Sequence, residues 1–380
     1  MATDTKAVAP APGIRFTVAS RPQTRFSNVQ TVSNFAGATS LAPIPLPATG
    51  FVRRIRLFVT ATFTTASAAA VVAGDAPFNL LSSITLTDAT GQPITQPISG
   101  YNLYLVNKYL PGGDKVGLPG PFHNPHLGPD YAFAASGTSG SAYFVLDLDL
   151  EQDPHTGYAC VPNLDSNASL QLKIDVAAYT VAFTGTTPSA ATVSVRTQTN
   201  YWAPVGPTTG GVPNQTTPPG FGDFLETRYE NQTATASAEN TINVNNRGGM
   251  IKGIIAVSRA SGTRTAFTAA TNVGLVYDNN AIDEGVLLES FQNDVRHQTG
   301  YVGADLTTSY APLTAGVLPG LDRGVLPFLF TNRGMGRDTW LNTRVGTLLQ
   351  IKATPGASAT QLELVTQLMQ VRDPASFFAA

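Results

Sequence analysis

The sequence predicts an all-β chain of two tandem eight-stranded jelly-roll β-sandwiches, with short helices in the connecting loops. Its 380 residues exceed what one hydrophobic core usually supports, so two domains are expected. Short β-rich runs recur on both sides of a Pro/Gly-rich segment, and the long helices that βαβ units require are missing. Among sandwiches the jelly roll is favoured because it tolerates long inserted loops, and residues 111–141 form such an insertion.

Composition along the chain sets the expected domain boundaries. Residues 1–12 are rich in Ala, Pro and Thr and are expected to form an N-terminal arm that folds only against a neighbour. Pro and Gly recur over 204–221, which excludes this segment from a sheet interior and makes it the predicted linker. The first jelly roll is then expected over 13–203 and the second over 222–373, followed by a C-terminal tail at 374–380.

Alternating or continuous apolar runs rich in β-branched and aromatic residues indicate the strands. Before the linker, the sequence has such runs at 14–18, 26–32, 52–63, 78–86, 142–150, 169–176 and 192–202. After the linker, the runs are 224–229, 241–244, 250–257, 273–277, 325–330, 347–353 and 361–371. This even spacing of short strands is typical of sandwiches.

Two segments show helical spacing instead. Apolar residues at intervals of three and four favour a short helix over 101–110. The clearest helix is expected over 283–297, where Phe291 and Val295 belong to the apolar stripe. Asp283 is expected to cap the first free amide groups of that helix.

The low content of charge restricts the kinds of partner. Charged residues are 13% of the chain, about half the usual share, so the surface must consist mainly of small polar and apolar groups. Such a surface suits a protein packed against copies of itself; the alternative is an ordinary β-rich protein with a neutral exterior. The formal net charge of -2 and the absence of Lys/Arg runs exclude nucleic acid as a specific partner.

The single cysteine and the hydropathy pattern bear on the compartment. Cys160 cannot form an internal disulfide, and its apolar neighbours indicate a small buried residue. We find no signal-peptide pattern and no apolar run long enough to cross a bilayer. The chain is therefore expected to be made in the cytoplasm and to remain soluble.

Histidines form a weak candidate for a metal site. His123 and His126 flank Pro125, which prevents a helical turn, and no third ligand lies at a usual spacing. His155 could join them only through the fold. Ordinary loop histidines are the favoured interpretation.

Four acids alternate with leucines along one strand and its loop, which places them on one face: Asp147, Asp149, Glu151 and Asp153. Their carboxylates could bind calcium. A solvated or interface face is favoured, with repulsion relieved by basic residues of the 52–63 run, namely Arg53, Arg54 and Arg56.

Catalytic motifs are missing from the sequence. It has no Gly-x-Ser-x-Gly, phosphate loop or His-Glu-x-x-His pattern, and neither Trp202 nor Trp340 lies beside the acidic pair that a glycosidase needs. We therefore predict no catalytic, cofactor-binding or metal-binding residue, no cofactor, and no enzymatic activity.

One region resembles a known family. Residues 76–110 join an Asn-Leu-led strand, an Asp-containing turn and a Ser-Gly-aromatic segment, and the matching positions are Ser99, Gly100, Tyr101, Leu103, Val106 and Asn107. A strand from Gly140, an acidic loop at 151–153, the Cys160 to Asn163 segment and a strand over 170–176 follow in order. In order and spacing this region resembles the double jelly-roll major capsid proteins of tailless, internal-membrane phages, the tectivirus-like members of the adenovirus-type lineage. The second half is similar more loosely.

The resemblance implies a structural protein of an icosahedral virion. Three copies would form a pseudo-hexameric capsomer that tiles a shell over a lipid vesicle. The implied partners are the other chains of the homotrimer, neighbouring capsomers, minor capsid and vertex proteins, and the membrane surface through the arm at 1–12. The alternatives are another β-sandwich virion component, such as a spike or minor capsid protein, and a carbohydrate-binding or hydrolytic sandwich protein.

Overall fold

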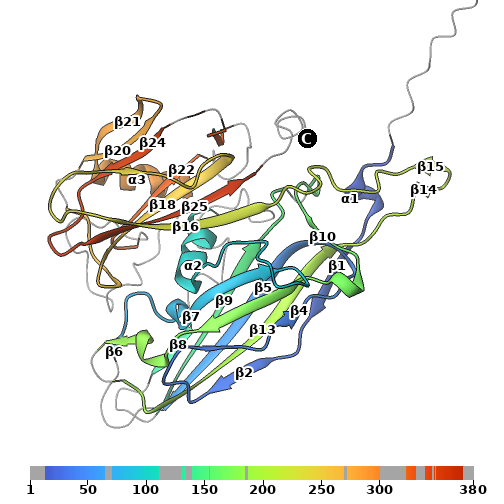
Figure 1. Ribbon diagram of the computed structural model, residues 1–380, viewed down its shortest axis with the longest axis horizontal. Coiled ribbons are helices and arrows are strands. Elements are labelled where there is room, and N and C mark those ends of the chain that lie inside the picture. Colours follow the sequence, from blue (N-terminus) through green and yellow to red (C-terminus); the bar gives the residue numbers. More distant parts are fainter. Residues whose placement is uncertain are drawn as a thin grey trace, which may run out of the picture.

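The chain folds into two β-sandwiches that lie side by side, with one helix between them (Figure 1). This computed structural model describes residues 13–64, 71–110, 130–133, 139–153, 155–184, 187–268, 272–299, 322–330, 339–344, 346 and 348–370. The arm at 1–12, the tail at 374–380, His123, His126 and most of the insertion at 111–141 lie outside these residues. No helix within the described ranges is long and apolar enough to cross a membrane.

The first jelly roll contains a seven-stranded and a four-stranded sheet. The larger sheet has the order β1 (Pro22–Phe26), β13 (Ala190–Trp202), β5 (Gly50–Thr64), β9 (Ser139–Asp149) and β8 (Asp130–Phe133), with β2 (Gln30–Ser33) on β13 and β10 (Val161–Asn163) on β5. The smaller sheet joins β3 (Thr39–Ser40), β11 (Gln171–Val176), β4 (Ile44–Pro45) and β7 (Leu81–Thr87). A separate pair is formed by β6 (Val71–Val72) and β12 (Phe183–Thr184).

Residue alternation along β5 explains how the first core forms. Ile55, Leu57 and Val59 are fully buried and point to one face of the sheet, as the two-residue period of a strand requires. They belong to one hydrophobic cluster with Leu172 and Ile174 of β11, in the smaller sheet. A register shift of one residue would turn this apolar row outward, so the core fixes the register of β5.

The second jelly roll repeats this plan with a six-stranded and a four-stranded sheet. The larger sheet contains β16 (Leu225–Thr233), β25 (Gln361–Met369), β18 (Met250–Ala260), β19 (Thr263–Arg264), β22 (Val325–Leu329) and β23 (Leu341–Asn342). The smaller sheet contains β17 (Asn240–Asn243), β24 (Leu349–Ala353), β20 (Asn272–Tyr277) and β21 (Asn280–Leu287). β18 is buried on both faces along most of its length, which is why its sequence is apolar without alternation.

Three sequence predictions need correction. The run at 14–18 overlaps the short helix α1 (Phe16–Ala19) instead of forming a strand. The run at 26–32 is divided between β1 and β2. The helix expected from residue 283 begins only at Leu288, as α3 (Leu288–Thr299), so Asp283 lies in β21 and not at the start of the helix. Pairing of β21 with β20 overrides the helical spacing there.

The helix predicted over 101–110 is confirmed as α2 (Gly100–Tyr109). Ser99 caps it, because the hydroxyl accepts a hydrogen bond from the Asn102 amide at 3.2 Å. A Cβ atom at Gly100 would lie 2.3 Å from the Phe78 carbonyl oxygen. Only glycine therefore lets the helix start so close to Phe78, which precedes β7. Every residue of α2 is buried.

We expect Gly100→Ala to destabilise the chain by about 1–3 kcal/mol, because the backbone of Phe78 would have to move. Gly37→Ala is the matched control, since a Cβ atom there meets nothing within 4 Å. Thermal unfolding followed by circular dichroism measures both variants. Equal melting temperatures for the two would contradict the close packing of α2.

Candidate functional site

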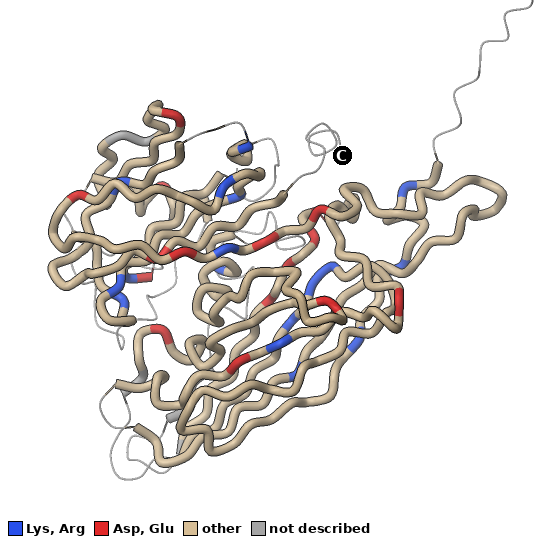
Figure 2. The backbone as a smooth tube through the Cα atoms, in the orientation of Figure 1, with Lys and Arg blue, Asp and Glu red and all other residues tan. Residues whose placement is uncertain are grey.

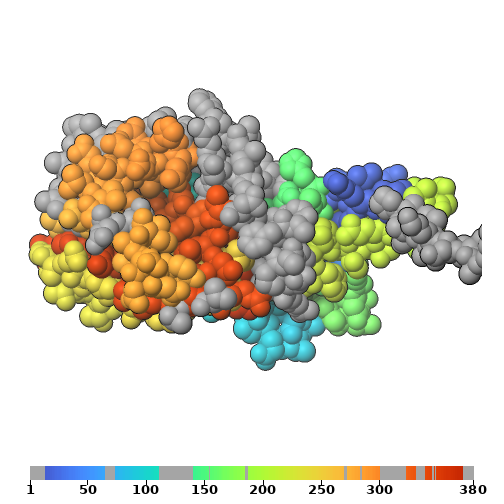
Figure 3. Space-filling view, turned by 90° about the horizontal axis from the view of Figure 1, so that it is seen from above, coloured from blue at the N-terminus to red at the C-terminus, as the bar shows by residue number. Residues whose placement is uncertain are grey.

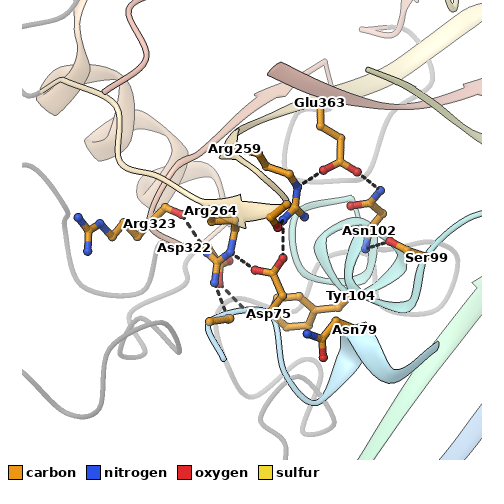
Figure 4. A network of polar contacts seen from close by, with 12 residues as sticks. Asp75, Asn79, Ser99, Asn102, Tyr104, Arg259, Arg264, Asp322, Arg323 and Glu363 are labelled. Atoms are coloured by element: carbon orange, nitrogen blue, oxygen red, sulfur yellow. Dashed lines mark hydrogen bonds and ion pairs between the residues drawn. The ribbon is translucent and has the colours of Figure 1, made fainter. Parts of the chain in front are cut away.

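Charged side chains are buried where the two jelly rolls meet, and we call this set of contacts the interdomain network (Figure 4). Helix α2 lies at its centre. It packs against β7 and β9 of the first jelly roll and against β25 of the second. The network therefore connects elements that are far apart in the sequence.

Asp75 of the first jelly roll binds two arginines of the second. Its carboxylate lies 2.5 Å from Arg259 Nη1 and also accepts a hydrogen bond from Arg264 Nε. Arg264 Nη2 donates to the carbonyl oxygen of Gly74 at 2.6 Å, and Nη1 donates to that of Arg323 at 2.9 Å. The loop before β7 is thus held to β18 and β19 by directional contacts.

Glu363 extends the network to α2. One carboxylate oxygen accepts from Arg259 Nε, and the other accepts from Asn102 Nδ2 at 2.6 Å. The guanidinium carbon of Arg264 also lies 4.8 Å from the centre of the Tyr101 ring. Burial raises the pKa of Tyr101 well above its ordinary value, so the ring stays neutral and can face a cation.

Asp322 of the second jelly roll is surrounded by donors from α2. Lys108 Nζ lies 2.7 Å from Oδ2, Tyr109 donates to Oδ2 at 2.9 Å, and Tyr104 donates to Oδ1 at 3.2 Å. Burial opposes ionisation of this carboxyl, but the positive charges of Lys108 and Arg264 outweigh it and lower the pKa of Asp322. Asp322 is therefore a carboxylate at neutral pH.

Close packing continues at the end of α2. Lys252 of β18 donates from Nζ to the carbonyl oxygen of Leu110 at 3.1 Å, which satisfies a helix-terminal acceptor. A Cβ atom on Gly253 would lie 2.4 Å from a methyl carbon of Leu110. Glycine at this position leaves room for the Leu110 side chain against β18.

The predicted arginine partners of the acidic row are confirmed. Arg54 and Arg56 of β5 stand opposite acids of β9 in the antiparallel register. The ion pairs are Arg54 with Asp149 at 2.5 Å, Arg56 with Asp147 at 2.7 Å and Arg53 with Glu151 at 2.7 Å. The acids Asp147, Asp149 and Glu151 are buried within the chain, so the expected solvated or interface face is wrong for them.

Two hydrogen bonds hold α2 against this strand. The Asn107 side chain of α2 accepts from the Asp147 amide and donates to the Asp147 carbonyl, both at 2.7 Å. This pair of bonds imitates a neighbouring strand along β9, and it places α2 over the acidic segment. Asp153, by contrast, turns to its own loop and accepts from the His155 amide at 2.9 Å.

Glu151 lies in a second buried group, near the start of β16. Its Oε1 accepts from Trp202 Nε1 at 2.6 Å and contacts Cys160 Sγ at 3.5 Å. Burial raises the pKa of Glu151, and it also raises that of Cys160. Cys160 is a fully buried thiol, as the sequence predicted. The amide of Leu225 donates to the adjacent Leu150 carbonyl, so β16 starts from this point.

The chemistry of these groups is that of structural attachment. Each carboxylate of the interdomain network has a cation or an amide as partner. Within the described ranges no group of three or more His, Cys, Asp and Glu residues could hold a metal ion. The interdomain network has no signal in the sequence, because Asp75 and Arg259 are 184 positions apart and belong to no local pattern.

Comparisons with known proteins agree with this architecture. No protein-family model matches the sequence, and no curated protein matches it. Solved structures do match in fold. The major capsid protein of Sulfolobus turreted icosahedral virus is similar with a TM-score of 0.61 at 15% identity, over 93% of this chain and 97% of that chain.

Two further solved structures extend the likeness. The capsid of the virus PBCV-1 gives a TM-score of 0.56 at 11% identity over 96% of both chains. The Faustovirus major capsid protein gives 0.51 at 8% identity, over 97% of this chain and 92% of that chain. The double jelly-roll fold predicted from the sequence is thereby confirmed along nearly the whole chain.

We expect Asp322→Asn to lower the free energy of unfolding by about 3–5 kcal/mol at neutral pH, because Lys108 would remain buried without its carboxylate. The folded pKa of Asp322 lies below its ordinary value of 3.8, so the ionised group stabilises the fold above that pH. This contribution is lost as the pH falls through the folded pKa, and the variant should then approach the parent. Urea unfolding across pH measures it.

The exposed residue Glu239 supplies the matched control for this experiment. Glu239→Gln removes a carboxylate from a surface turn and should change stability by about 0.5 kcal/mol or less. A similar small effect for Asp322→Asn would show that the buried pair contributes nothing.

Proposed function

We propose that this protein is the major capsid protein of an icosahedral virus. The observation that carries the proposal is the likeness of fold to capsid proteins over nearly the full length of both chains, with both jelly rolls included. A likeness confined to one sandwich would fit many unrelated proteins. The role is structural and involves no catalytic, cofactor-binding or metal-binding residue.

The division of the chain follows from this role. The first jelly roll spans 13–203, a linker spans 204–221 and the second jelly roll spans 222–373, with an arm at 1–12 and a tail at 374–380. Two similar sandwiches in one chain allow three copies to occupy six quasi-equivalent positions around an axis. The interdomain network supports this function, because it fixes how the two sandwiches are joined.

The partners we propose are two further copies of the chain in a homotrimer, neighbouring capsomers, and minor capsid and vertex proteins. The low overall charge supports large contacts between copies, because few charged side chains must be desolvated when two copies associate. The protein would be located in the virion capsid, after synthesis and assembly in the host cytoplasm. An internal membrane beneath the shell would contact the arm at 1–12.

Purified protein should be a trimer that grows into closed shells. Light scattering coupled to size-exclusion chromatography gives the mass, and negative-stain electron microscopy shows the particles. A folded monomer at micromolar concentration would refute the capsid role. Trimers that never form a lattice would instead favour a spike protein, and binding to a glycan array would favour a carbohydrate-binding sandwich.

Removal of residues 2–12 should leave trimers intact and reduce the yield of closed shells. The Ala/Pro-rich composition of this arm gives too few apolar contacts to offset the entropy of ordering alone, so only neighbours can fix it. Particle yield by sedimentation, compared with that of the full chain, is the measurement. Unchanged yield would mean that the arm has no part in assembly.

A further inference from the structure

We propose that the hairpin at residues 207–214 is an arm that docks onto a second copy of this chain. It consists of β14 (Thr208–Thr209) and β15 (Val212–Pro213), which pair antiparallel. The hairpin projects from the end of the first jelly roll, away from the second (Figures 1 and 3). The inference rests on the proposed function, since it requires that copies of the chain associate.

The tip of the hairpin has a defined conformation. Gly210 and Gly211 form the two-residue loop, with φ values of 58° and 82°. Positive φ at both positions is typical of the type I′ turn, whose twist matches that of paired strands. The sequence therefore carried a local signal for this hairpin, although Pro and Gly predicted only a linker.

The base of the hairpin is anchored to the body of the protein. Ile14 donates its amide to the Pro213 carbonyl at 2.9 Å, and its own carbonyl accepts from the Gln215 amide at 2.9 Å. Asn214 Nδ2 donates to the Gly206 carbonyl and to Thr209 Oγ1, at 2.9 Å and 2.8 Å. These bonds fix the direction in which the hairpin points.

Beyond its base, the hairpin has no core of its own. Residues 206–213 are all exposed, and Val212 has 43% of its surface accessible. An isolated two-stranded hairpin is marginally stable in water, and its strand edges offer unpaired backbone groups. Anchored and yet uncovered, the hairpin is preorganised for a partner, which lowers the entropic cost of binding.

Charge selects the class of partner. No Lys, Arg, Asp or Glu occurs between Arg196 and Asp223, and the projecting tube is uncharged in Figure 2. A nucleic acid needs basic contacts, and a membrane surface needs basic or several large apolar side chains, neither of which the hairpin offers. A low-charge protein surface fits, and this chain has one with only 13% charged residues.

The start of the described chain packs closely against the base of the hairpin. Gly13 lies against the hairpin, since a Cβ atom on it would be 3.0 Å from the Pro213 carbonyl oxygen. The base of the hairpin is therefore held against the body, while its tip remains exposed. An exposed, rigid tip of this kind can contact a neighbouring copy at little entropic cost.

A single engineered thiol tests the inference. The only native cysteine, Cys160, is fully buried, so Val212→Cys creates one reactive thiol for a benzophenone maleimide. Photolysis of the assembled, labelled protein should give a covalent dimer on a denaturing gel. Tenfold dilution of the assembled protein should not change the yield, because the crosslink forms within the assembly. Crosslinks that stay within one chain would overturn the docking of the hairpin.

Paired substitutions at the same residue give a second readout. Val212→Asp places a charge in the contact and should weaken association at least tenfold, whereas the nearly isosteric Val212→Thr should change it little. Both variants should keep the melting temperature of the parent, because the side chain is exposed. Equal association of the two variants in a parent that does assemble would overturn this inference alone. A parent that remains monomeric would instead refute the capsid role.

Discussion

Each jelly roll carries a carboxylate that is paired with a cation of the other jelly roll. Asp75 of the first receives Arg259 and Arg264 from the second, and Asp322 of the second receives Lys108 from the first. Removal of one partner from a buried pair costs several kcal/mol, so neither surface would tolerate separation from the other. These reciprocal ion pairs fix the relative placement of the two sandwiches. The proposed use of one chain for two lattice positions depends on that placement.

Helix α2 connects the two sandwiches, and a local sequence motif determines where this helix begins. Ser99 and Gly100 fix where the helix starts, and the residues that follow reach both sandwiches. Asn107 covers the edge of β9, whereas Asn102 and Lys108 bind acids of the second jelly roll. Buried polar side chains need partners, and Asn107 and Lys108 have theirs on different sandwiches.

The contrast between local and distant contacts explains what could be predicted. Arg54 and Arg56 could be assigned to the acids of β9 because neighbouring strands bring opposite charges into register. The pairing of Asp75 with Arg259 could not, since it depends on how two complete domains dock. Asp283 was misassigned because helical spacing is a local signal, and pairing with β20 is decided by the whole sheet.

Burial of charged side chains inside the chain also lowers the number of charged groups on the surface. Arg54, Asp147, Asp149, Lys252 and Glu363 are among the buried charged residues, so the exterior holds even less charge than the composition suggests. Internal ion pairs thus fix the fold, while the outside keeps neutral groups that lose little on desolvation. A neutral exterior favours many close contacts between identical copies, and specificity must then come from shape. In the proposed capsid, the anchored hairpin and the fixed placement of the two sandwiches would supply it.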